Sequence, residues 1–293
     1  MTASAGHHQS PAILITGATD GLGRAMAVFL AANGYRIFAA GRNAEKRASL
    51  DRLALERKLQ LETLDMDVSD DVSVSHGVGR VLERAGRIDV LINNAGIAYV
   101  AVLEEIRLDD LRRQYETNVF GVLRVTQAVL PSMRERRSGR ILNVSSIAGK
   151  IALPLMGPYA SSKHALEGLS DSLRLELAPF GVRVVLIEPG FIPTNMSNTA
   201  LDLSAAYAAK AEKSPYAAIY RGFRDSWKKS SSASRTTPED CARVILRAIL
   251  DTPPRARYTV TPRARVGVVL KRFLPDRVLD KRILRSMGLD KPL

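Results

Sequence analysis

The sequence is short of several features on which whole classes of protein depend. Cys241 is the single cysteine among 293 residues, so an intrachain disulfide is excluded, and we expect this thiol to be a small buried group on a helix. No apolar run reaches the roughly 18 residues that a membrane span needs. Residues 1–10 lack a hydrophobic signal segment, and we expect a frayed tail there. These absences suit a cytoplasmic protein.

What remains has the composition of a globular α/β protein. Hydrophobic residues make up 46% of the chain and charged residues 25%. Short apolar runs alternate with helical patterns, of which the longest covers about 109–137. Repeated strand–helix units predict one domain with a doubly wound parallel sheet. The predicted strands are 12–16, 35–40, 61–66, 88–93, 140–145, 182–188 and 257–261.

A glycine-rich turn follows the first predicted strand. It reads Thr16-Gly17-Ala18-Thr19-Asp20-Gly21-Leu22-Gly23 and leads into a helical pattern. Such a turn lets the backbone approach a pyrophosphate, which the helix N-terminus then favours. The spacing Gly-x-x-x-Gly-x-Gly is wider than the usual dinucleotide motif, and an ordinary strand-to-helix turn is the alternative interpretation.

A tyrosine, a lysine and a serine form the second motif. Tyr159 and Lys163 are four residues apart, so they share one face of a helix, and Ser146 lies thirteen residues before Tyr159. An ammonium group near a phenol favours phenolate, so we expect Lys163 to lower the pKa of Tyr159 from about 10. Such a tyrosine can donate a proton to an alkoxide or accept one from an alcohol. A surface pair on a helix would give the same spacing.

With both motifs in one chain, residues 11–262 resemble the short-chain dehydrogenase/reductase superfamily. Four further segments carry the resemblance: Asp67-Val68, Asp89-Val90-Leu91-Ile92-Asn93-Asn94-Ala95-Gly96, Asn143-Val144-Ser145-Ser146, and Pro189-Gly190-Phe191-Ile192-Pro193-Thr194. The resemblance implies a Rossmann-type catalytic domain over 11–262, with a substrate lid at about 195–235. A serine-rich stretch in that lid, 229–234, is expected to be a flexible loop. Residues 263–293 form an extension.

The resemblance also implies roles for individual residues. Asn118, Ser146, Tyr159 and Lys163 would be catalytic: Ser146 polarises the substrate carbonyl, Tyr159 is the acid or base, Lys163 binds the nicotinamide ribose, and Asn118 holds a water that links Lys163 to solvent. No metal is expected. The residues implied to contact the cofactor are Thr16, Gly17, Asp20, Gly21, Leu22, Gly23, Arg42, Asp67, Val68, Asn94, Ala95, Gly96, Tyr159, Lys163, Pro189, Gly190, Ile192 and Thr194.

The residues after the second predicted strand bear on the choice between NADP and NAD. An NAD enzyme commonly has an acidic residue there to bind the ribose hydroxyl, whereas this chain has Gly41 and Arg42. A guanidinium group can pair with a 2′-phosphate, which favours NADP(H). Asp20 argues for the alternative, NAD(H), because a carboxylate near the phosphate would repel it.

The side chains around the catalytic motifs are mostly apolar. They are Ile97, Val100, Ile151, Leu153, Met156, Phe191 and Ile192, and the lid adds Tyr207, Tyr216, Tyr220, Phe223 and Trp227. An apolar, aromatic cleft suggests a hydrophobic ketone, aldehyde or alcohol, such as a steroid, retinoid, lipid or aromatic carbonyl compound. Some of these residues could instead pack the lid onto the core.

Positive charge is concentrated near the C-terminus. The net charge is +13, and residues 255–293 hold eleven Lys and Arg against three Asp, which gives +8 of that total. Apolar residues recur at helical spacing beside these cations, and Pro275 predicts two short helices. The segment can pack against the sheet or lid, which we favour, or lie on an anionic membrane surface. It is also similar, more loosely than the core motifs, to the basic tails of hydroxysteroid- and retinol-dehydrogenase-like members.

The sequence therefore predicts an NADP-dependent oxidoreductase acting on a small hydrophobic substrate. The alternative is a catalytically silent dinucleotide-binding scaffold or sensor that acts through a partner. Nucleic-acid binding is not expected, because the basic residues interleave with aliphatic ones and no stacking aromatics accompany them. The oligomeric state, a homo-oligomer included, is left open.

Overall fold

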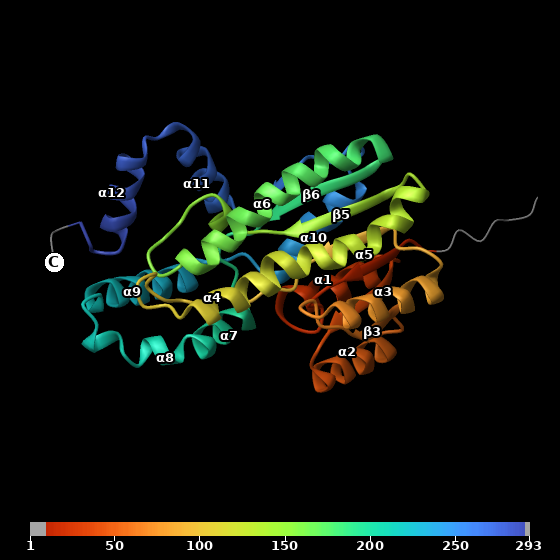
Figure 1. Cartoon of the computed structure of the whole chain (residues 1–293), viewed down its shortest axis with the longest axis horizontal. Coiled ribbons are helices and arrows are strands. Elements are labelled where there is room, and N and C mark those ends of the chain that lie inside the picture. The colour runs from red at the N-terminus through yellow and green to blue at the C-terminus, as the bar shows by residue number, and fades with distance from the viewer. Residues whose placement is uncertain (1–9, 291–293) are drawn as a thin grey trace, which may run out of the picture.

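The computed structural model describes residues 10–290, so the predicted tail at 1–10 lies outside the described residues except for Ser10. A seven-stranded sheet forms the centre of this part of the chain (Figure 1). Every pairing in it is parallel, and the strand order is β3-β2-β1-β4-β5-β6-β7. The strands are β1 (Ala12–Ile15), β2 (Arg36–Gly41), β3 (Leu61–Asp65), β4 (Val90–Asn93), β5 (Gly139–Val144), β6 (Val182–Glu188) and β7 (Arg257–Thr259).

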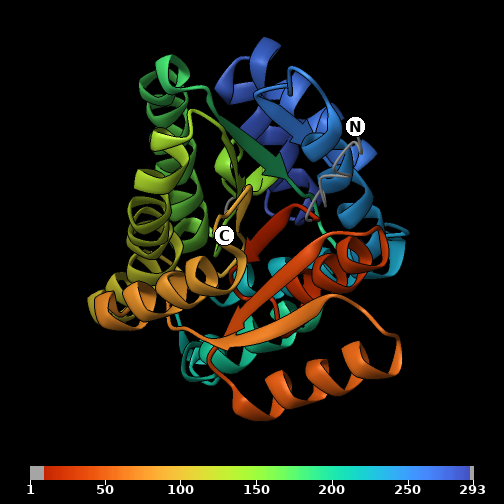
Figure 2. The same cartoon turned by 90° about the vertical axis from the view of Figure 1, so that its right-hand side faces the viewer.

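Helices cover both faces of the sheet (Figure 2). On one face, Ile13 and Ile15 of β1 pack in a core with α1 (Gly21–Ala32), α2 (Ala44–Glu56) and α10 (Pro238–Leu250). On the other, Leu14 packs in a core with α3 (Asp71–Ala85), α5 (Gly121–Glu135) and α6 (Gly157–Leu177). Because alternate strand residues face opposite sides, nearly continuous apolar strands supply both cores. The predicted α/β fold with a doubly wound parallel sheet is confirmed.

The helix starts follow local capping chemistry. The Asn43 side chain accepts the Lys46 amide at the start of α2. Thr237 and Asp240 form a capping box at the start of α10. The expected helix over 109–137 consists of α4 (Leu108–Tyr115), a π-helical turn (Glu116–Phe120) and α5.

The lid and the C-terminal extension lie together at one end of the molecule (Figure 1). The lid contains α7 (Asn195–Leu203), α8 (Ala205–Ala208) and α9 (Ala217–Ala233). The prediction of a loop at 229–234 is wrong, because α9 continues to Ala233; serine costs a helix only a fraction of a kcal/mol per residue, which tertiary packing overrides. The extension forms two helices, α11 (Pro262–Phe273) and α12 (Asp276–Ser286), and Pro275 separates them as predicted. Among residues 10–290, no helix combines the length and apolarity that crossing a bilayer demands.

Candidate active site

The strand order reverses between β1 and β4, and the candidate site lies at the carboxyl ends of these strands. After β1 the chain runs to β2 on one side, whereas after β4 it runs to β5 on the other. The connections that follow neighbouring strands therefore diverge and leave a crevice. The glycine turn follows β1, the Asn94–Gly96 segment follows β4, Ser146 follows β5, and Pro189–Thr194 follows β6.

Two glycines allow the turn after β1 to pack closely against the adjacent backbone. Gly17 has φ +60°, and a Cβ there would lie 2.8 Å from Ala95 Cα. A Cβ on Gly23 would lie 2.1 Å from the Gly17 carbonyl oxygen. The first turn of α1 can therefore pack against the glycine turn only if position 23 is a glycine. Asp20 caps α1 by accepting the Gly21 amide at 2.7 Å. The turn is thus a compact cradle at a helix N-terminus, which suits an anion.

Thr16 and Asn94 hold the ends of β1 and β4 together beneath this cradle. The Asn94 amide group donates to the carbonyl oxygens of Thr16 and Gly17, both at 3.0 Å. The Thr16 hydroxyl accepts the backbone N–H groups of Asn94 and Ala95 at 3.0 and 3.1 Å. These two side chains position the crevice wall.

Ser146, Tyr159 and Lys163 meet at one place, although they come from two elements. Ser146 follows β5 and its hydroxyl accepts the Ala148 amide at 3.1 Å, while Tyr159 and Lys163 lie in the first two turns of α6. Lys163 is buried, and its Nζ donates to the Val144 carbonyl at 2.8 Å and lies 5.7 Å from the centre of the Tyr159 ring.

Burial dominates the ionisation of the tyrosine and the lysine. Desolvation raises the pKa of Tyr159 to about 12, and the Ser146 hydroxyl acts in the opposite direction. Desolvation also lowers the pKa of Lys163 to about 8, which the Glu167 carboxylate opposes. The pKa of Tyr159 therefore lies above its ordinary value, and not below it as expected from the Lys163 spacing, because burial disfavours the charged phenolate. The phenol is protonated at neutral pH.

Asn118 lies in the π-helical turn and is completely buried. Its carboxamide donates to the Ile97 carbonyl at 2.9 Å and to Ser162 Oγ at 3.1 Å, and it accepts the Ile97 amide at 2.8 Å. The side chain therefore secures the segment after β4 to α6. In a π-helical turn, the backbone hydrogen bonds join residues five apart, so the regular bonding of an α-helix to residues four apart is interrupted.

Two cavities meet at the catalytic candidates. One, of about 230 Å³, is lined by the glycine turn, the segment after β4, Lys163 and the Pro189–Thr194 segment. The other, of about 360 Å³, is an apolar cleft beneath the lid. Ser146 and Tyr159 line both, so they stand in the shared wall. Of the residues implied to contact the cofactor, Gly17, Asp20, Gly21, Leu22, Gly23, Asn94, Ala95, Gly96, Tyr159, Lys163, Pro189, Gly190, Ile192 and Thr194 line the first cavity.

Arg42, Asp67 and Val68 lie outside that cavity, and Arg42 and Asp67 form an ion pair. Arg42 Nη1 is 3.1 Å from Asp67 Oδ2, and both groups are partly exposed. Lys46, which the sequence analysis did not single out, forms an ion pair with Asp20. Its place in the first turn of α2, four residues after Arg42, is the signal that could have identified it. The Asp20 carboxylate thus has a cationic partner, which reduces its repulsion of a nearby anion.

Gly41 explains why this chain has no acidic residue at the end of β2. A Cβ there would lie 2.5 Å from Thr19 Oγ1 and 2.6 Å from Thr19 Cγ2. Thr19 is itself buried in the glycine turn, so any side chain at position 41 would require the Thr19 side chain to move. Packing against Thr19 therefore disfavours the acidic side chain that NAD enzymes commonly have here.

The lid aromatics divide into two groups. Phe191, Phe223 and Trp227 line the cleft, and the Phe191 and Trp227 rings form an edge-on contact with centroids 4.9 Å apart. Three lid tyrosines instead bond to carboxylates outside the cleft, Tyr207 to Asp110, Tyr216 to Glu104 and Tyr220 to Glu105. Val100 is likewise buried away from the cleft, and Ile97 lines the cofactor cavity. The extension contributes Ser286 and Met287 to the cleft, and no local sequence pattern indicates this contact.

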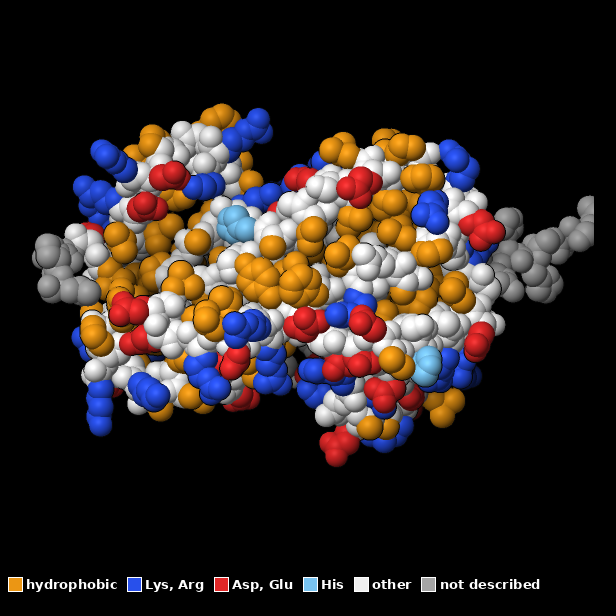
Figure 3. Space-filling model, in the orientation of Figure 1, with side chains coloured by type: hydrophobic (Ala, Val, Ile, Leu, Met, Phe, Trp, Pro, Cys, Tyr) orange, Lys and Arg blue, Asp and Glu red, His pale blue; other side chains and the backbone are white. Residues whose placement is uncertain are grey.

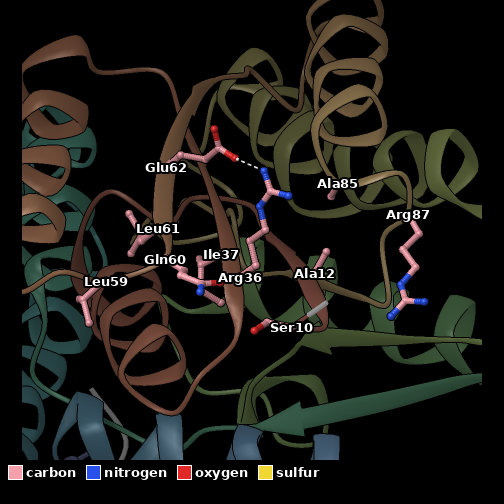
Figure 4. A pocket seen from close by; sticks show the side chains of 10 residues that line it. All are labelled: Ser10, Ala12, Arg36, Ile37, Leu59, Gln60, Leu61, Glu62, Ala85 and Arg87. Carbon is pink, nitrogen blue, oxygen red and sulfur yellow. Dashed lines mark hydrogen bonds and ion pairs between the residues drawn. The ribbon is translucent and has the colours of Figure 1, made fainter. Parts of the chain in front are cut away.

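Another hollow lies at the opposite edge of the sheet (Figure 4). It is lined by the amino-terminal ends of β1, β2 and β3, with Arg36 pairing with Glu62 at 3.4 Å. None of the predicted site residues is among its lining residues, so it has no part in the site described above.

Comparison with known proteins identifies the family. A family model described as short chain dehydrogenase matches residues 11–203. An uncharacterized oxidoreductase, YusZ, of Bacillus subtilis is 34% identical over 276 residues, covering 92% of this chain and 97% of the relative. A 3-ketodihydrosphingosine reductase of Bacteroides thetaiotaomicron is 37% identical over 190 residues, covering 65% of this chain and 67% of the relative.

A solved structure gives the same answer. The chain is similar to a variant of actinorhodin polyketide ketoreductase solved with NADPH, with a TM-score of 0.74, 29% identity and coverage of 88% of this chain and 97% of that one. The family model spans more than half of the sequence and agrees with the fold and the motifs. The chain belongs to the short-chain dehydrogenase/reductase family.

Proposed function

We propose that this oxidoreductase uses NADP(H) to interconvert a ketone or aldehyde and an alcohol on a hydrophobic substrate. The observation that carries the proposal is the shared wall, in which Ser146 and Tyr159 line both the crevice at the glycine turn and the apolar cleft. A proton donor between these cavities can act on a substrate in one while a dinucleotide is held in the other.

The chain's own groups supply the proton chemistry. A bound nicotinamide dinucleotide supplies or accepts the hydride. Ser146 donates a hydrogen bond to the substrate oxygen, and Tyr159, protonated at neutral pH, passes its proton to that oxygen during reduction. In oxidation the same oxygen returns the proton to Tyr159. Lys163 lies 5.7 Å from the ring centre and lowers the cost of the phenolate that forms.

The residues of the crevice fit a dinucleotide. The close approach of Gly17 and Gly23 leaves the backbone at the start of α1 accessible to a pyrophosphate, and Lys163 offers a cation deeper in the cavity. We assign the proton relay from Lys163 to the region of Asn118, whose π-helical turn lies against α6. This assignment rests on the family resemblance.

Three observations favour NADP over NAD. Arg42 follows β2 directly and Lys46 lies in the first turn of α2, Asp20 has Lys46 as a partner, and a side chain on Gly41 would clash with Thr19. A solved relative was crystallised with NADPH. The two cations would bind a 2′-phosphate through charge-assisted hydrogen bonds.

The cleft indicates the substrate class. Its lining is mainly aliphatic, aromatic and methionine side chains, with Ser146 and Tyr159 as polar groups at the reacting end. A few placed polar groups in an apolar cleft fix the orientation of a largely apolar ligand. The relative from B. thetaiotaomicron is named as a 3-ketodihydrosphingosine reductase, and a ketone is also the group proposed here. Ketones and aldehydes with alkyl-chain or ring systems are the substrates to test first.

The decisive variant is Tyr159→Phe. Because the phenol is the proposed proton donor, we expect turnover with NADPH and a hydrophobic ketone to fall about 10²–10⁴-fold while NADPH binding is retained. Tyr216→Phe is the matched control, since its hydroxyl bonds to Glu104 outside the cleft. Near-normal turnover of Tyr159→Phe would refute the mechanism. Dinucleotide binding with no turnover of any ketone or alcohol by the native chain would favour the scaffold alternative.

A further inference from the structure

The C-terminal extension is anchored to the lid by one set of its side chains. We call α11 and α12, with the residues after them to Asp290, the arch (Figure 1). Leu279 and Met287 are buried, and Ile283, Met287 and Leu289 pack in the apolar cluster that contains Tyr220 and Phe223. The predicted packing against the lid therefore accounts for part of the arch.

A second set of apolar side chains on the arch remains exposed. Val266, Val269 and Phe273 have 59%, 54% and 75% of their surface open to solvent. Their spacing of three and four residues places them on one side of α11. On α12, Val278 and Leu284 are exposed at 44% and 38%. The intramolecular packing thus leaves an apolar stripe on α11 uncovered.

Cations accompany this stripe. Arg265 and Arg272 are seven residues apart and therefore form a row beside Val269 and Phe273, and the Arg272 guanidinium carbon is 5.9 Å from the centre of the Phe273 ring. Arg277, Lys281 and Arg282 are exposed on α12. Over residues 262–290 the sequence has eight Lys and Arg against three Asp, and Figure 3 shows basic side chains around this end of the molecule.

Acidic residues of the arch neutralise few of these cations. Lys271 pairs with Asp276 at 2.5 Å, and Arg285 pairs with Asp290 at 3.4 Å. Among the ion pairs of residues 10–290, none includes Arg265, Arg272, Arg277, Lys281 or Arg282. The exposed apolar stripe is therefore bordered by uncompensated positive charge.

The arch is continuous with the apolar cleft. Ser286 and Met287, at the end of α12, line the cleft. Gly267 of α11 lies against Ile147 and Ile151, since a Cβ on it would be 3.0 and 3.2 Å from their terminal methyl carbons, and both isoleucines line the same cleft. Whatever binds the arch is consequently held beside the cleft.

We propose that the arch docks the protein on an anionic lipid bilayer, with the Val266, Val269 and Phe273 stripe in the headgroup region and the neighbouring cations on the lipid phosphates. Exposed apolar side chains bordered by basic ones are the composition of a helix that lies in the membrane interface. Charge complementarity selects an anionic surface, and the absence of a spanning helix among residues 10–290 makes the attachment peripheral. Docking places the cleft at the bilayer surface, where lipophilic compounds are concentrated.

The test is flotation of the full chain with vesicles. We expect the protein to float with vesicles of phosphatidylcholine mixed with phosphatidylglycerol, and not with phosphatidylcholine alone. Raising salt from about 0.05 M to about 0.5 M should release most of it, because screening weakens attraction to surface charge. The variant Arg265→Gln/Arg272→Gln/Arg277→Gln should lose at least about tenfold in vesicle affinity.

Two further variants make the result specific to the arch. Arg52→Gln/Arg80→Gln/Arg134→Gln removes three exposed cations elsewhere that have no ion pair among residues 10–290, and it should float like the native chain. Phe273→Ser should weaken flotation without changing the thermal midpoint, because this side chain is already exposed.

Three outcomes would overturn the proposal. They are failure of the native chain to float with anionic vesicles, equal losses in the arch and control triple variants, and a native homodimer that Phe273→Ser converts to monomers without any vesicle binding. The last outcome would assign the stripe to a second copy of the chain. The readout is independent of catalysis, so a failed activity assay does not affect it.

Discussion

At the scale of single residues, the buried lysine determines how the protein should respond to pH. Desolvation lowers the pKa of Lys163 to about 8, so its ammonium group is present below that pH and lost as pH rises through it. The phenol of Tyr159, with its pKa raised to about 12, stays protonated over the same range. The lysine is therefore the first of the two groups to change its charge above neutrality.

We predict that kcat/KM for NADPH falls as pH rises above about 8, because the free enzyme then loses the cation in its cofactor cavity. Lys163→Arg should have a lower maximum rate but should remove this alkaline limb, since a guanidinium group stays charged. Lys150→Arg, outside the cavity, should keep the limb. A native profile that is flat from about pH 7 to pH 10 would contradict the assignment.

The cations at the end of β2 give the second residue-scale prediction. Arg42→Ala/Lys46→Ala should weaken NADPH binding about tenfold or more and change NADH binding little, because only NADPH has a phosphate for these groups to bind. Arg52→Ala, an exposed arginine further along α2, is the control. Fluorescence titration of both dinucleotides measures the effect. If the native chain binds NADH as tightly as NADPH, the preference for NADP is wrong.

At the scale of the elements, α10 offers a clean test of local stabilisation. Thr237 accepts the Asp240 amide at 3.2 Å, and the Asp240 carboxylate accepts the Thr237 amide at 2.8 Å. Thr237→Ala should lower the free energy of unfolding by about 1 kcal/mol and the thermal midpoint by about 2 °C, with turnover unchanged. Thr237→Ser should behave like the native chain in the same melting experiment. Equal stability of all three would show that packing of α10 alone determines its start.

The elements also show what the sequence can and cannot predict. The strands were predicted within one or two residues, because apolar runs between turn residues act over a few positions. The serine-rich end of α9 was assigned wrongly, because Ser230 faces the cleft and the lid packs there, a contact that no local pattern reveals. The π-helical turn around Asn118 was missed for the same reason.

The site shows a similar division. Most residues that the resemblance implies for the cofactor, such as those of the glycine turn, line one crevice. Lys46 was missed because its proximity to Asp20 depends on how α2 packs against the turn. The expected direction of the Tyr159 pKa shift was wrong because it was argued from the spacing to Lys163, whereas burial, a property of the folded chain, is the largest contribution.

At the scale of the whole molecule, the arch and the lid stabilise one another. A Cβ on Gly222 of α9 would lie 2.4 Å from the Met287 carbonyl oxygen, so the two segments meet at this glycine. We predict that Gly222→Ala detaches α12 and makes the arch sensitive to trypsin. The arch is rich in Lys and Arg, after which trypsin cleaves, so its detachment should be detected readily. Gly79→Ala is the control, because space around Gly79 is open. Unchanged proteolysis of Gly222→Ala would show that the contact is dispensable.

Removal of the arch is the more severe version of this test. A chain ending at Pro262 would uncover the lid cluster around Tyr220 and Phe223, and it would lose two residues of the cleft wall. We expect such a protein to aggregate or to lose turnover, measured by light scattering and by the ketone assay. A truncated chain that is monodisperse and fully active would show that the arch has no role in the folded domain.

The sheet order has a consequence for the way the chain is made. In β1, Ile13 pairs with Ile37 of β2 on one side and with Val90 of β4 on the other. During synthesis, the first three strands can therefore pair with one another, while the other edge of β1 stays open until β4 leaves the ribosome. The cofactor cavity is completed later still, by Lys163 and the Pro189–Thr194 segment. A dinucleotide can thus stabilise the chain only after residue 194 of 293 has been made, and the earlier part must rely on its own core or on a chaperone.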